Sequence, residues 1–282
     1  MKLVWHDAAK EFVDTVEQDL PDGLASHSLV IGLAMRRASQ ENNSTPPALL
    51  LTHHEEGHLL GVAFMTPPRK LLVHAEPEAA SLLAHEIHRR GWAVPGLHAN
   101  VPAAEFFAAA WSDLTGQDHH LGVAERLYVL SAVRSPDYSL GCCRQALPED
   151  AEQLVAWQLD FQRAALPEDP VAEADVRNAI AVEIEGGDRH VWDHDGLVST
   201  AVRCRPTPTG AGITGVYTPP EFRGRGYATS CVARLSQMIL DSGNSYAYLF
   251  TDLSNPTSNS IYQKIGYRPV CDFQNYAFAG EQ

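Results

Sequence analysis

The feature of this 282-residue sequence that most constrains its fold is a glycine-containing loop between a strand-like and a helix-like segment. The loop occupies residues 222–229, and the strand-like residues 212–218 precede it. Residues 227–242 place apolar side chains at helical spacing and stop at Gly243, a typical left-handed helix terminator. Such a junction presents unpaired amide hydrogens at the positive end of a helix dipole, so it predicts a phosphate-binding loop.

The loop reads Phe222-Arg223-Gly224-Arg225-Gly226-Tyr227-Ala228-Thr229. Its two glycines allow the backbone to approach an anion closely, and the small Ala228 lets the helix sit tightly on the strand. The two arginines either add positive charge or remain in solvent. The glycine spacing does not fit the G-x-G-x-x-G dinucleotide pattern, and no Walker lysine-serine pair is present. An ordinary tight turn is the alternative interpretation.

From Gly141 onward, strand-like and helix-like segments alternate, which predicts an α/β (α+β) domain built on one main sheet. The expected helices cover residues 149–165, 173–185, 227–242 and a short stretch from Asn255-Pro256 to Gly266. The expected strands cover residues 190–193, 197–203, 212–218, 246–251, 267–270 and 273–278.

This segment resembles the GNAT superfamily of acyl-CoA-dependent N-acyltransferases. The family loop has arginine or glutamine, two residues, glycine, one residue, and then glycine or alanine, and the matching residues are Arg223, Gly226 and Ala228. Downstream the family has an asparagine, a short helix carrying a tyrosine, and a glycine-aromatic pair. The residues that fill this second pattern are Asn255, Asn259, Tyr262, Gly266 and Tyr267. The resemblance covers roughly residues 141–278.

The resemblance implies an enzyme that moves an acetyl or other short acyl group from acetyl-CoA, or another short acyl-CoA, to a primary amine of a small molecule. The amine attacks directly through a tetrahedral intermediate, and a backbone amide of the central strand stabilises the oxyanion. Tyr262 is the implied general acid for the CoA thiolate, with a plain core tyrosine as the alternative. The implied cosubstrate-binding residues are Val216, Tyr217, Thr218, Arg223, Gly224, Arg225, Gly226, Tyr227, Ala228, Thr229, Asn255 and Asn259.

Two parts of the site remain open at this level. The general base has four candidates, namely Asp193, Asp252, Glu173 and a chain of water molecules. The family lines its acceptor pocket with the first two helices and their loop. The corresponding residues here are Trp157, Phe161, Arg163 and the segment 166–170. Asn255 can also act simply as a helix cap.

The first half of the chain carries a weaker version of the same pattern. Thr66-Pro67-Pro68 precedes Gly91 by the spacing that separates Thr218-Pro219-Pro220 from Gly243, which predicts an internal duplication. The same offset places Leu71, His74 and Glu76 where the second half has Arg223, Gly226 and Ala228. We therefore expect tandem GNAT-like domains, each with a mixed, mostly antiparallel sheet flanked by helices. They comprise a degenerate, non-catalytic domain at residues 1–135 and a catalytic domain at residues 136–282.

Composition narrows the partners and the location. A net charge of −14, with dispersed lysines and arginines, argues against nucleic acid as a partner. No apolar run reaches the length of a membrane helix, so we expect no membrane partner and a cytoplasmic protein, as a monomer or homodimer. The five cysteines have no C-x-x-C spacing and are expected to be reduced and mostly buried. The histidine clusters at 53–58 and 85–88 do not match H-E-x-x-H spacing, so no metal is predicted.

Three functions compete on the sequence. The leading one is the N-acyltransferase. The second is a non-catalytic acyl-CoA-binding sensor or regulatory subunit, which the unassigned general base motivates. The third is a purely structural pair of α/β domains, in which the glycine loop is incidental.

Overall fold

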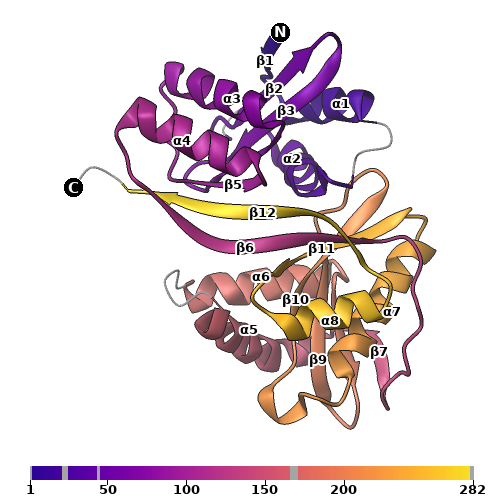
Figure 1. The fold of residues 1–282 in the computed structure, drawn as a ribbon. Helices are drawn as coiled ribbons and strands as arrows, with labels where there is room; N and C mark the ends of the chain where they lie inside the picture. The colour runs from indigo at the N-terminus through magenta and orange to yellow at the C-terminus, as the bar shows by residue number, and fades with distance from the viewer. Residues whose placement is uncertain (1, 21–24, 43–44, 166–170, 280–282) are drawn as a thin grey trace.

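The computed structural model describes residues 2–20, 25–42, 45–165 and 171–279 (Figure 1). These residues form a mixed α/β protein in which one order of strands and helices occurs twice. The first series is β1 (Lys2–Trp5), α1 (Ala9–Asp19), α2 (Ser28–Gln40), β2 (Leu49–Glu55), β3 (His58–Met65), β4 (Leu71–Ala75), α3 (Pro77–Arg89), β5 (Gly96–Asn100), α4 (Ala103–Thr115) and β6 (His119–Leu130). The second is β7 (Cys142–Gln145), α5 (Ala151–Ala165), α6 (Glu173–Glu185), β8 (Arg189–Asp193), β9 (Leu197–Cys204), β10 (Gly210–Tyr217), α7 (Tyr227–Asp241), β11 (Tyr246–Asp252), α8 (Pro256–Lys264) and β12 (Arg268–Phe278). Short 3-10 turns, η1 (Pro148–Asp150) and η2 (Pro220–Phe222), precede α5 and α7.

All the described strands join in one sheet with the order β1-β2-β3-β4-β5-β12-β6-β11-β10-β9-β8-β7. The pairs β4–β5 and β10–β11 are parallel, and the other neighbouring strands pair antiparallel. The sheet is therefore mixed and mostly antiparallel, as the sequence predicted. The expected boundary at residues 135/136 lies in the connection between β6 and β7.

The two halves exchange their last strands at the centre of the sheet. β12, from the second half, pairs with β5 of the first, and β6, from the first half, pairs with β11 of the second. β6 and β12 also pair with each other, so the two long strands cross the middle of the molecule side by side (Figure 1). Arg126 on β6 bonds Asp272 on β12 through both carboxylate oxygens, at 2.5 and 2.8 Å. Each half of the sheet is therefore completed by a strand from the other half.

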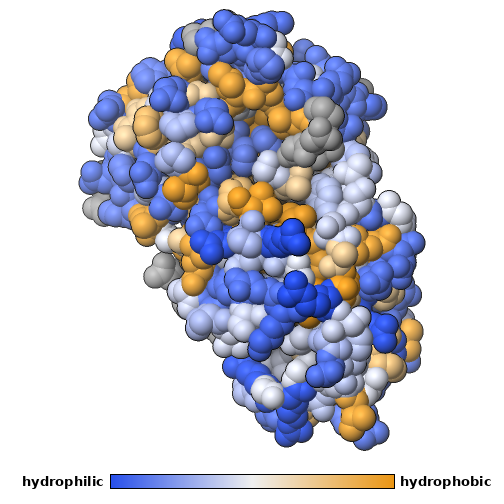
Figure 2. Space-filling view, turned by 45° about the vertical axis from the view of Figure 1, so that its right-hand side comes forward, coloured by the Kyte–Doolittle hydropathy of each residue, from blue (hydrophilic) through white to orange (hydrophobic). Residues whose placement is uncertain are grey.

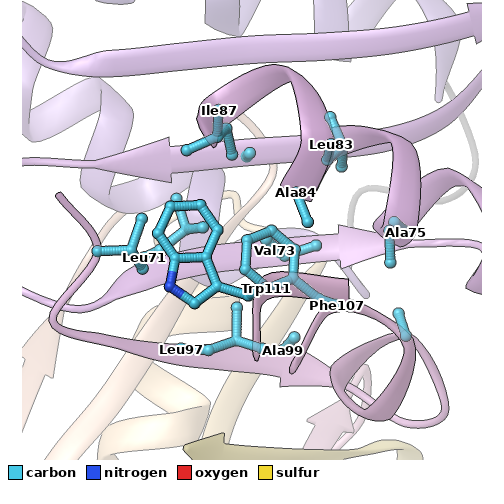
Figure 3. Close-up of a cluster of buried hydrophobic side chains, with 14 of the residues drawn as sticks. Leu71, Val73, Ala75, Leu83, Ala84, Ile87, Leu97, Ala99, Phe107 and Trp111 are labelled. Carbon is cyan, nitrogen blue, oxygen red and sulfur yellow. The ribbon is translucent and has the colours of Figure 1, made fainter. Parts of the chain in front are cut away.

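Helices cover both faces of the sheet in each half. In the first half, α3 and α4 bury one cluster against β2–β5, and Figure 3 shows Trp111 of α4 beside Leu71 and Leu97 and Phe107 of the same helix beside Val73. The rings of Phe107 and Trp111 stack with their centroids 5.9 Å apart. Helices α1 and α2 bury a second cluster on the opposite face. In the second half, α7 and α8 cover one face and α5 and α6 the other.

Successive residues of strand β2 belong to the two hydrophobic clusters of the first half in turn. On β2, Leu49 and Leu51 face α3 and α4, while Leu50 between them faces α1 and α2. This alternation is the two-residue period of a strand, and it explains why β2 begins with three consecutive leucines, 49–51, rather than with alternating apolar and polar residues.

The structure differs from the sequence prediction at two strands. The sequence pattern also favours a strand at residues 126–133, and the structure has β6 at 119–130 instead, because β6 extends along β12 as far as the pair His119↔Phe278. The expected strands 267–270 and 273–278 are one strand, β12, with a register shift between Pro269 and Cys271. Residues 131–141 leave the sheet and form a linker to β7.

The predicted duplication is present in the order of the elements, but the proposed residue offset is wrong at the loop. Thr66-Pro67-Pro68 precedes β4, whereas Thr218-Pro219-Pro220 follows β10, the equivalent strand. Leu71 and His74 consequently lie on β4 itself. Only Glu76 separates β4 from α3, whereas nine residues, 218–226, separate β10 from α7. Between β4 and α3, where every residue is described, there is therefore no counterpart of the glycine loop.

The structure also bears on the surface, on membrane-spanning helices and on the cysteines. Hydrophilic side chains cover much of the face shown in Figure 2. In the described part of the chain, no helix has the length and apolar character needed to cross a membrane. The five cysteines are free, as expected, but Cys231 is the one fully buried thiol among them, and Cys142 is exposed. The expectation that most of them are buried is therefore wrong.

Candidate functional site

Strands β10 and β11 run parallel and separate before either one ends. Their ladder covers Gly210↔Tyr246 to Gly212↔Tyr248, yet β10 continues to Tyr217 and β11 to Asp252. The outer edge of β11 stays paired with β6 as far as Asp252. Among the described residues, the facing edges beyond Gly212 have no ladder partner. An extended ligand can bind there as an added strand does.

A bulge in β10 gives a local reason for this divergence. Against β9, Thr214 pairs with Val202 and Tyr217 pairs with Thr200, so β10 uses one more residue than β9 between the two pairs. Gly215 lies in the bulge with φ +59°, a conformation that favours glycine. Bulges bend and twist a strand, and this one lies where β10 departs from β11.

Three residues at the end of β10, Val216, Tyr217 and Thr218, were predicted to bind the cosubstrate, and their backbones have different hydrogen-bond partners. The carbonyl oxygen of Tyr217 accepts a hydrogen bond from Ser199 Oγ at 3.1 Å. That of Thr218 accepts one from Arg223 Nε at 3.0 Å. Val216 lies within the bulge between these pairs. Within the described structure, Val216 is the residue of the three whose main chain has no such side-chain contact, so it is the one best placed to pair with a ligand.

The predicted phosphate loop has the geometry that its sequence requires. Gly224 and Gly226 have φ +76° and +79°, and Gly226 is the N-cap residue of α7 without a side-chain capping bond. In the described part of the chain, the amides of Gly224, Arg225 and Gly226 make no backbone hydrogen bond. Those of residues 227–229 lie in the first helical turn, where no intrahelical partner exists. Six consecutive main-chain donors therefore gather at the positive end of α7.

The two arginines of the loop behave differently. Arg223 donates to Thr218 O, and its guanidinium lies 6.0 Å from the centre of the Tyr217 ring. Arg223 is therefore engaged inside the loop, where it ties the end of β10 to the turn. Arg225 has an exposed side chain beside the donors and supplies positive charge there.

The predicted helix α8 brings the downstream motif next to the loop helix, because α8 packs against both α7 and β11. Asn255 caps α8 by accepting from Ser258 N at 3.1 Å, as predicted. Asn259 donates through Nδ2 to the carbonyl oxygens of Asp252, at 3.0 Å, and Asn255, at 2.7 Å. Its Oδ1 is buried and has no hydrogen-bond partner among the described residues. An orphaned buried acceptor of this kind fits an amide donor from a ligand.

Tyr262 is buried in the cluster that also contains Tyr227, Val216 and Phe222, so the folding brings strand, loop and α8 residues together. Burial raises the pKa of Tyr262 to about 12, against a smaller opposing effect of a hydrogen bond with Ser258. The phenol is therefore protonated throughout the neutral range, in the form that can donate a proton.

Each side-chain candidate for the base already has a partner. Asp193 bonds Arg144 at 2.9 Å, and Glu173 bonds Arg177 at 2.9 Å. Asp252 Oδ1 accepts from Ser254 N at 2.7 Å. Asp252 is the candidate that ends β11, at the open end of the strand divergence.

The opposite face of β10 carries the helices expected to line an acceptor pocket. Trp157 and Phe161 of α5 lie with their rings 6.0 and 6.3 Å from that of Tyr217. A cavity of about 180 Å³ lies between α5, α6 and the bulge at Gly215. Arg163 is exposed and bonds Asp160, and residues 166–170 lie outside the described residues.

Buried charge lines this cavity. Arg189 is 2% exposed and donates to Glu183 Oε2 at 2.6 Å. Asp175 adds a second, exposed carboxylate at the rim. The sequence reasoning did not find Arg189, because its role depends on an ion pair between a strand and a helix. Among the described residues, no group of acidic, histidine and cysteine side chains has the arrangement of a metal site.

The corresponding place in the first half is closed. Asn100, at the end of β5, bonds both backbone groups of Ala75 at the end of β4. Its Oδ1 accepts from Ala75 N at 2.9 Å, and its Nδ2 donates to Ala75 O at 3.0 Å. In addition, α3 and α4 pack closely, whereas α7 and α8 touch far less. In the described residues of the first half, the ends of β4 and β5 thus have neither the loop nor the open strand edges.

Comparisons with known proteins agree with this architecture. A family model described as FR47-like protein matches residues 194–277. Several of the similar solved structures cover nearly all of the chain. An acetyltransferase from the GNAT family from Colwellia psychrerythraea is 15% identical, with a TM-score of 0.59, over 99% of this chain and 100% of its own. A tandem GNAT protein from the clavulanic acid biosynthesis pathway is 16% identical, with a TM-score of 0.52, over 100% and 99%.

The chain has the tandem GNAT fold. A Drosophila protein shares this fold as well, at 12% identity and a TM-score of 0.67, over 98% of both chains. A search of curated proteins found no match. Within the tandem GNAT fold, the FR47-like match contains the bulged strand, the phosphate loop and α8, which are the elements of the candidate site.

Proposed function

We propose that this tandem GNAT protein is an N-acyltransferase that transfers an acetyl or other short acyl group from acyl-CoA to a primary amine of a small molecule. One observation carries the proposal: within the described structure, the facing edges of β10 and β11 are unpaired, and β10 leads into a loop with six main-chain donors that lack hydrogen-bond partners. The first feature suits the amide-containing pantetheine arm, and the second suits the diphosphate. Their combination fits the two ends of one cosubstrate.

The residues of the site have separate roles in this proposal. The amides of residues 224–229 bind the diphosphate, with added charge from Arg225. The main chain near Val216 and the orphaned Oδ1 of Asn259 bind the pantetheine amides. A main-chain amide at the bulge of β10 donates to the acyl oxygen as negative charge develops on it. The Tyr262 phenol donates its proton to the departing CoA sulfur.

The acceptor amine enters from the α5 and α6 side, where the cavity reaches the bulge. The carboxylate of Asp175 favours a cationic molecule there, because it has no ion pair among the described residues, whereas Glu183 is already paired with Arg189. The nucleophile must be neutral, so a base is required. We propose Asp252, directly or through a water molecule, because it lies at the open end of the divergence.

The remaining expectations belong to the same proposal. The protein acts in the cytoplasm on a small molecule, as a monomer or homodimer, without nucleic acid or membrane as a partner. The first half is a non-catalytic domain, because the loop is missing and Asn100 closes its strands.

The direct test measures release of free thiol from acetyl-CoA with a panel of primary amines, together with calorimetric binding of CoA. Wild type should bind CoA and release thiol with at least one amine, and Gly226→Glu should abolish both because its carboxylate occupies the anion site. Binding of CoA without turnover for any amine would instead identify a sensor. Absence of CoA binding by wild type would exclude both functions.

A further inference from the structure

We infer that the linker between the two halves, residues 131–141, holds the phosphate loop in its binding conformation, and that Ser139 is the positioning residue. The inference rests on the proposed function, because it concerns how the same loop binds the CoA diphosphate. The carrying observation is that this linker makes hydrogen bonds to the loop and to the first turn of α7.

Ser139 contacts the loop through both its side chain and its main chain. Its Oγ donates to Arg225 O at 2.8 Å. Its backbone amide donates to Ser230 Oγ, in the first turn of α7, at 2.9 Å. Ser139 therefore fixes the loop and the helix start with respect to each other.

The contact with Arg225 sets the direction of a ligand-binding donor. The carbonyl of Arg225 and the amide of Gly226 belong to one planar trans peptide, so they point in opposite directions. Because Ser139 holds the carbonyl on the linker side, the Gly226 amide points away from the linker. Without this contact, the peptide between two glycine-adjacent positions is free to rotate, since Gly224 and Gly226 allow many backbone conformations.

The linker is itself held in place, so it can act as a rigid support. Tyr138 stacks on Trp192, with centroids 6.4 Å apart and planes 6° apart, and Arg234 lies 4.2 Å from the centre of the Tyr138 ring. Trp192 Nε1 donates to Leu140 O at 2.9 Å. These contacts come from two different elements, β8 and α7.

The same linker also reaches the end of α8. Arg134 N donates to Ile265 O at 2.8 Å. Beside it, Gly266 has φ +110°, and a Cβ added there would lie 2.9 Å from Ala132 O. The linker thus connects the phosphate loop with the helix that carries Asn259 and Tyr262, and both are aligned by a segment that follows β6.

The test compares Ser139→Ala with Ser139→Thr, which keeps the hydroxyl, and with Ser135→Ala, an exposed linker serine, as the matched control. Two acyl donors separate the effects: acetyl-CoA, and acetyl-pantetheine, which has no phosphate. Loss of one positioning hydrogen bond should raise the Kd for CoA and the KM for acetyl-CoA by about fivefold to tenfold in Ser139→Ala. The kcat/KM for acetyl-pantetheine should not change. Ser139→Thr should restore most of the affinity, and Ser135→Ala should behave as wild type.

The outcomes distinguish this inference from the proposed function. If wild type binds CoA and Ser139→Ala binds it equally well, the inference is wrong and the proposed function stands. If Ser139→Ala loses activity equally with both donors, Ser139 supports the fold generally and not the phosphate loop, which also overturns the inference. If wild type does not bind CoA, the proposed function fails first. Thermal unfolding of each variant establishes that it is folded.

Discussion

The side-chain amide of Asn100 pairs with both the N–H and the C=O of Ala75, and so joins the ends of the parallel strands β4 and β5. The equivalent strands of the second half, β10 and β11, separate before their ends. In the second half, β10 and β11 have no equivalent contact beyond Gly212 among the described residues. The two halves share one order of elements and differ at the place where a ligand would enter. The side chain of Asn100 accounts for the closed ends of β4 and β5 in the first half.

Replacement of Asn100 should therefore affect stability and not the cosubstrate. Asn100→Ala leaves the backbone groups of Ala75 without these partners, and the free energy of unfolding should fall by about 1–3 kcal/mol. The Kd for CoA should stay at the wild-type value. Chemical denaturation and calorimetry measure the two quantities. Asn178→Ala, at an exposed position of α6, is the matched control and should change neither. A large change in CoA affinity in Asn100→Ala would show that the first half also binds the cosubstrate.

The two loop glycines provide a matched pair of substitutions. Gly224→Ala and Gly226→Ala both place a Cβ at positive φ, which costs about 1–2 kcal/mol. At Gly224, a Cβ meets no atom within 4 Å, whereas at Gly226 it lies 2.8 Å from Ser139 Oγ. Gly226→Ala should therefore weaken CoA binding clearly more than Gly224→Ala, as titration calorimetry would reveal. Equal losses in the two variants would mean that Ser139 does not constrain the loop.

Removal of the Tyr262 hydroxyl should slow the reaction without preventing binding. Tyr262→Phe should lower kcat by about 10²–10⁴-fold and leave the Kd for CoA nearly unchanged, because the phenol acts in proton transfer. Tyr267→Phe is the control. It removes a buried hydroxyl that bonds Ser236 at 2.9 Å, next to Tyr262, and should lower stability rather than kcat. The kcat of each variant is measured from steady-state rates with a saturating amine. An unchanged kcat in Tyr262→Phe would show that Tyr262 is a core residue and not the general acid.

Tyr262 should also make the free energy of unfolding depend on pH in the alkaline range. The pKa of Tyr262 in the folded protein is about 12, above its ordinary value of 10, because burial disfavours the charged phenolate. The folded state thus binds this proton more tightly than the unfolded state. The resulting stabilisation is complete below pH 10 and is lost as the pH rises from 10 to 12. Denaturation of wild type and Tyr262→Phe over this range should show a steeper fall for wild type.

Glu86, in the first half, should make the free energy of unfolding depend on pH in the acid range. A hydrogen bond from Arg89, with further ones from Trp5 and Arg90, lowers the pKa of Glu86 to about 2 from its ordinary 4.5. Its contribution to stability is present above pH 4.5 and is lost as the pH falls toward 2. The difference in unfolding free energy between wild type and Glu86→Gln should therefore shrink over that range. Glu78→Gln, an exposed position on the same helix, should show no such trend. A difference independent of pH would contradict the assignment.

Local sequence was sufficient for the features that depend on local chemistry. The glycines at 224 and 226, the cap at Asn255 and the helix at 173–185 were predicted at the residues where the structure has them, because dihedral freedom, capping and apolar spacing are properties of neighbouring residues. The repeated order of elements was also predictable from alternating patterns. The roles proposed for these residues in binding and catalysis stay predictions.

Features that depend on distant contacts were not predictable. The pairing of β5 with β12 joins residues such as Asn100 and Phe273, and no local pattern specifies it. The residue offset between the halves was wrong because an insertion of several residues before α7 has no counterpart before α3. Ser139 was missed because its partner Arg225 lies 86 positions away along the chain. The ion pair of Arg189 with Glu183 required knowledge of which strand lies under α6.

The exchange of β6 and β12 has a consequence for how the chain is made. During synthesis on a ribosome, β5 emerges long before β12. The edge of β5 that pairs with β12 therefore stays unpaired until almost all of the described chain has been translated. Contacts of such large sequence separation close slowly, and an open strand edge is prone to join other chains. A gene split at the linker would give two fragments that each lack the strand needed to cap their sheet, so they should become stable only when expressed together.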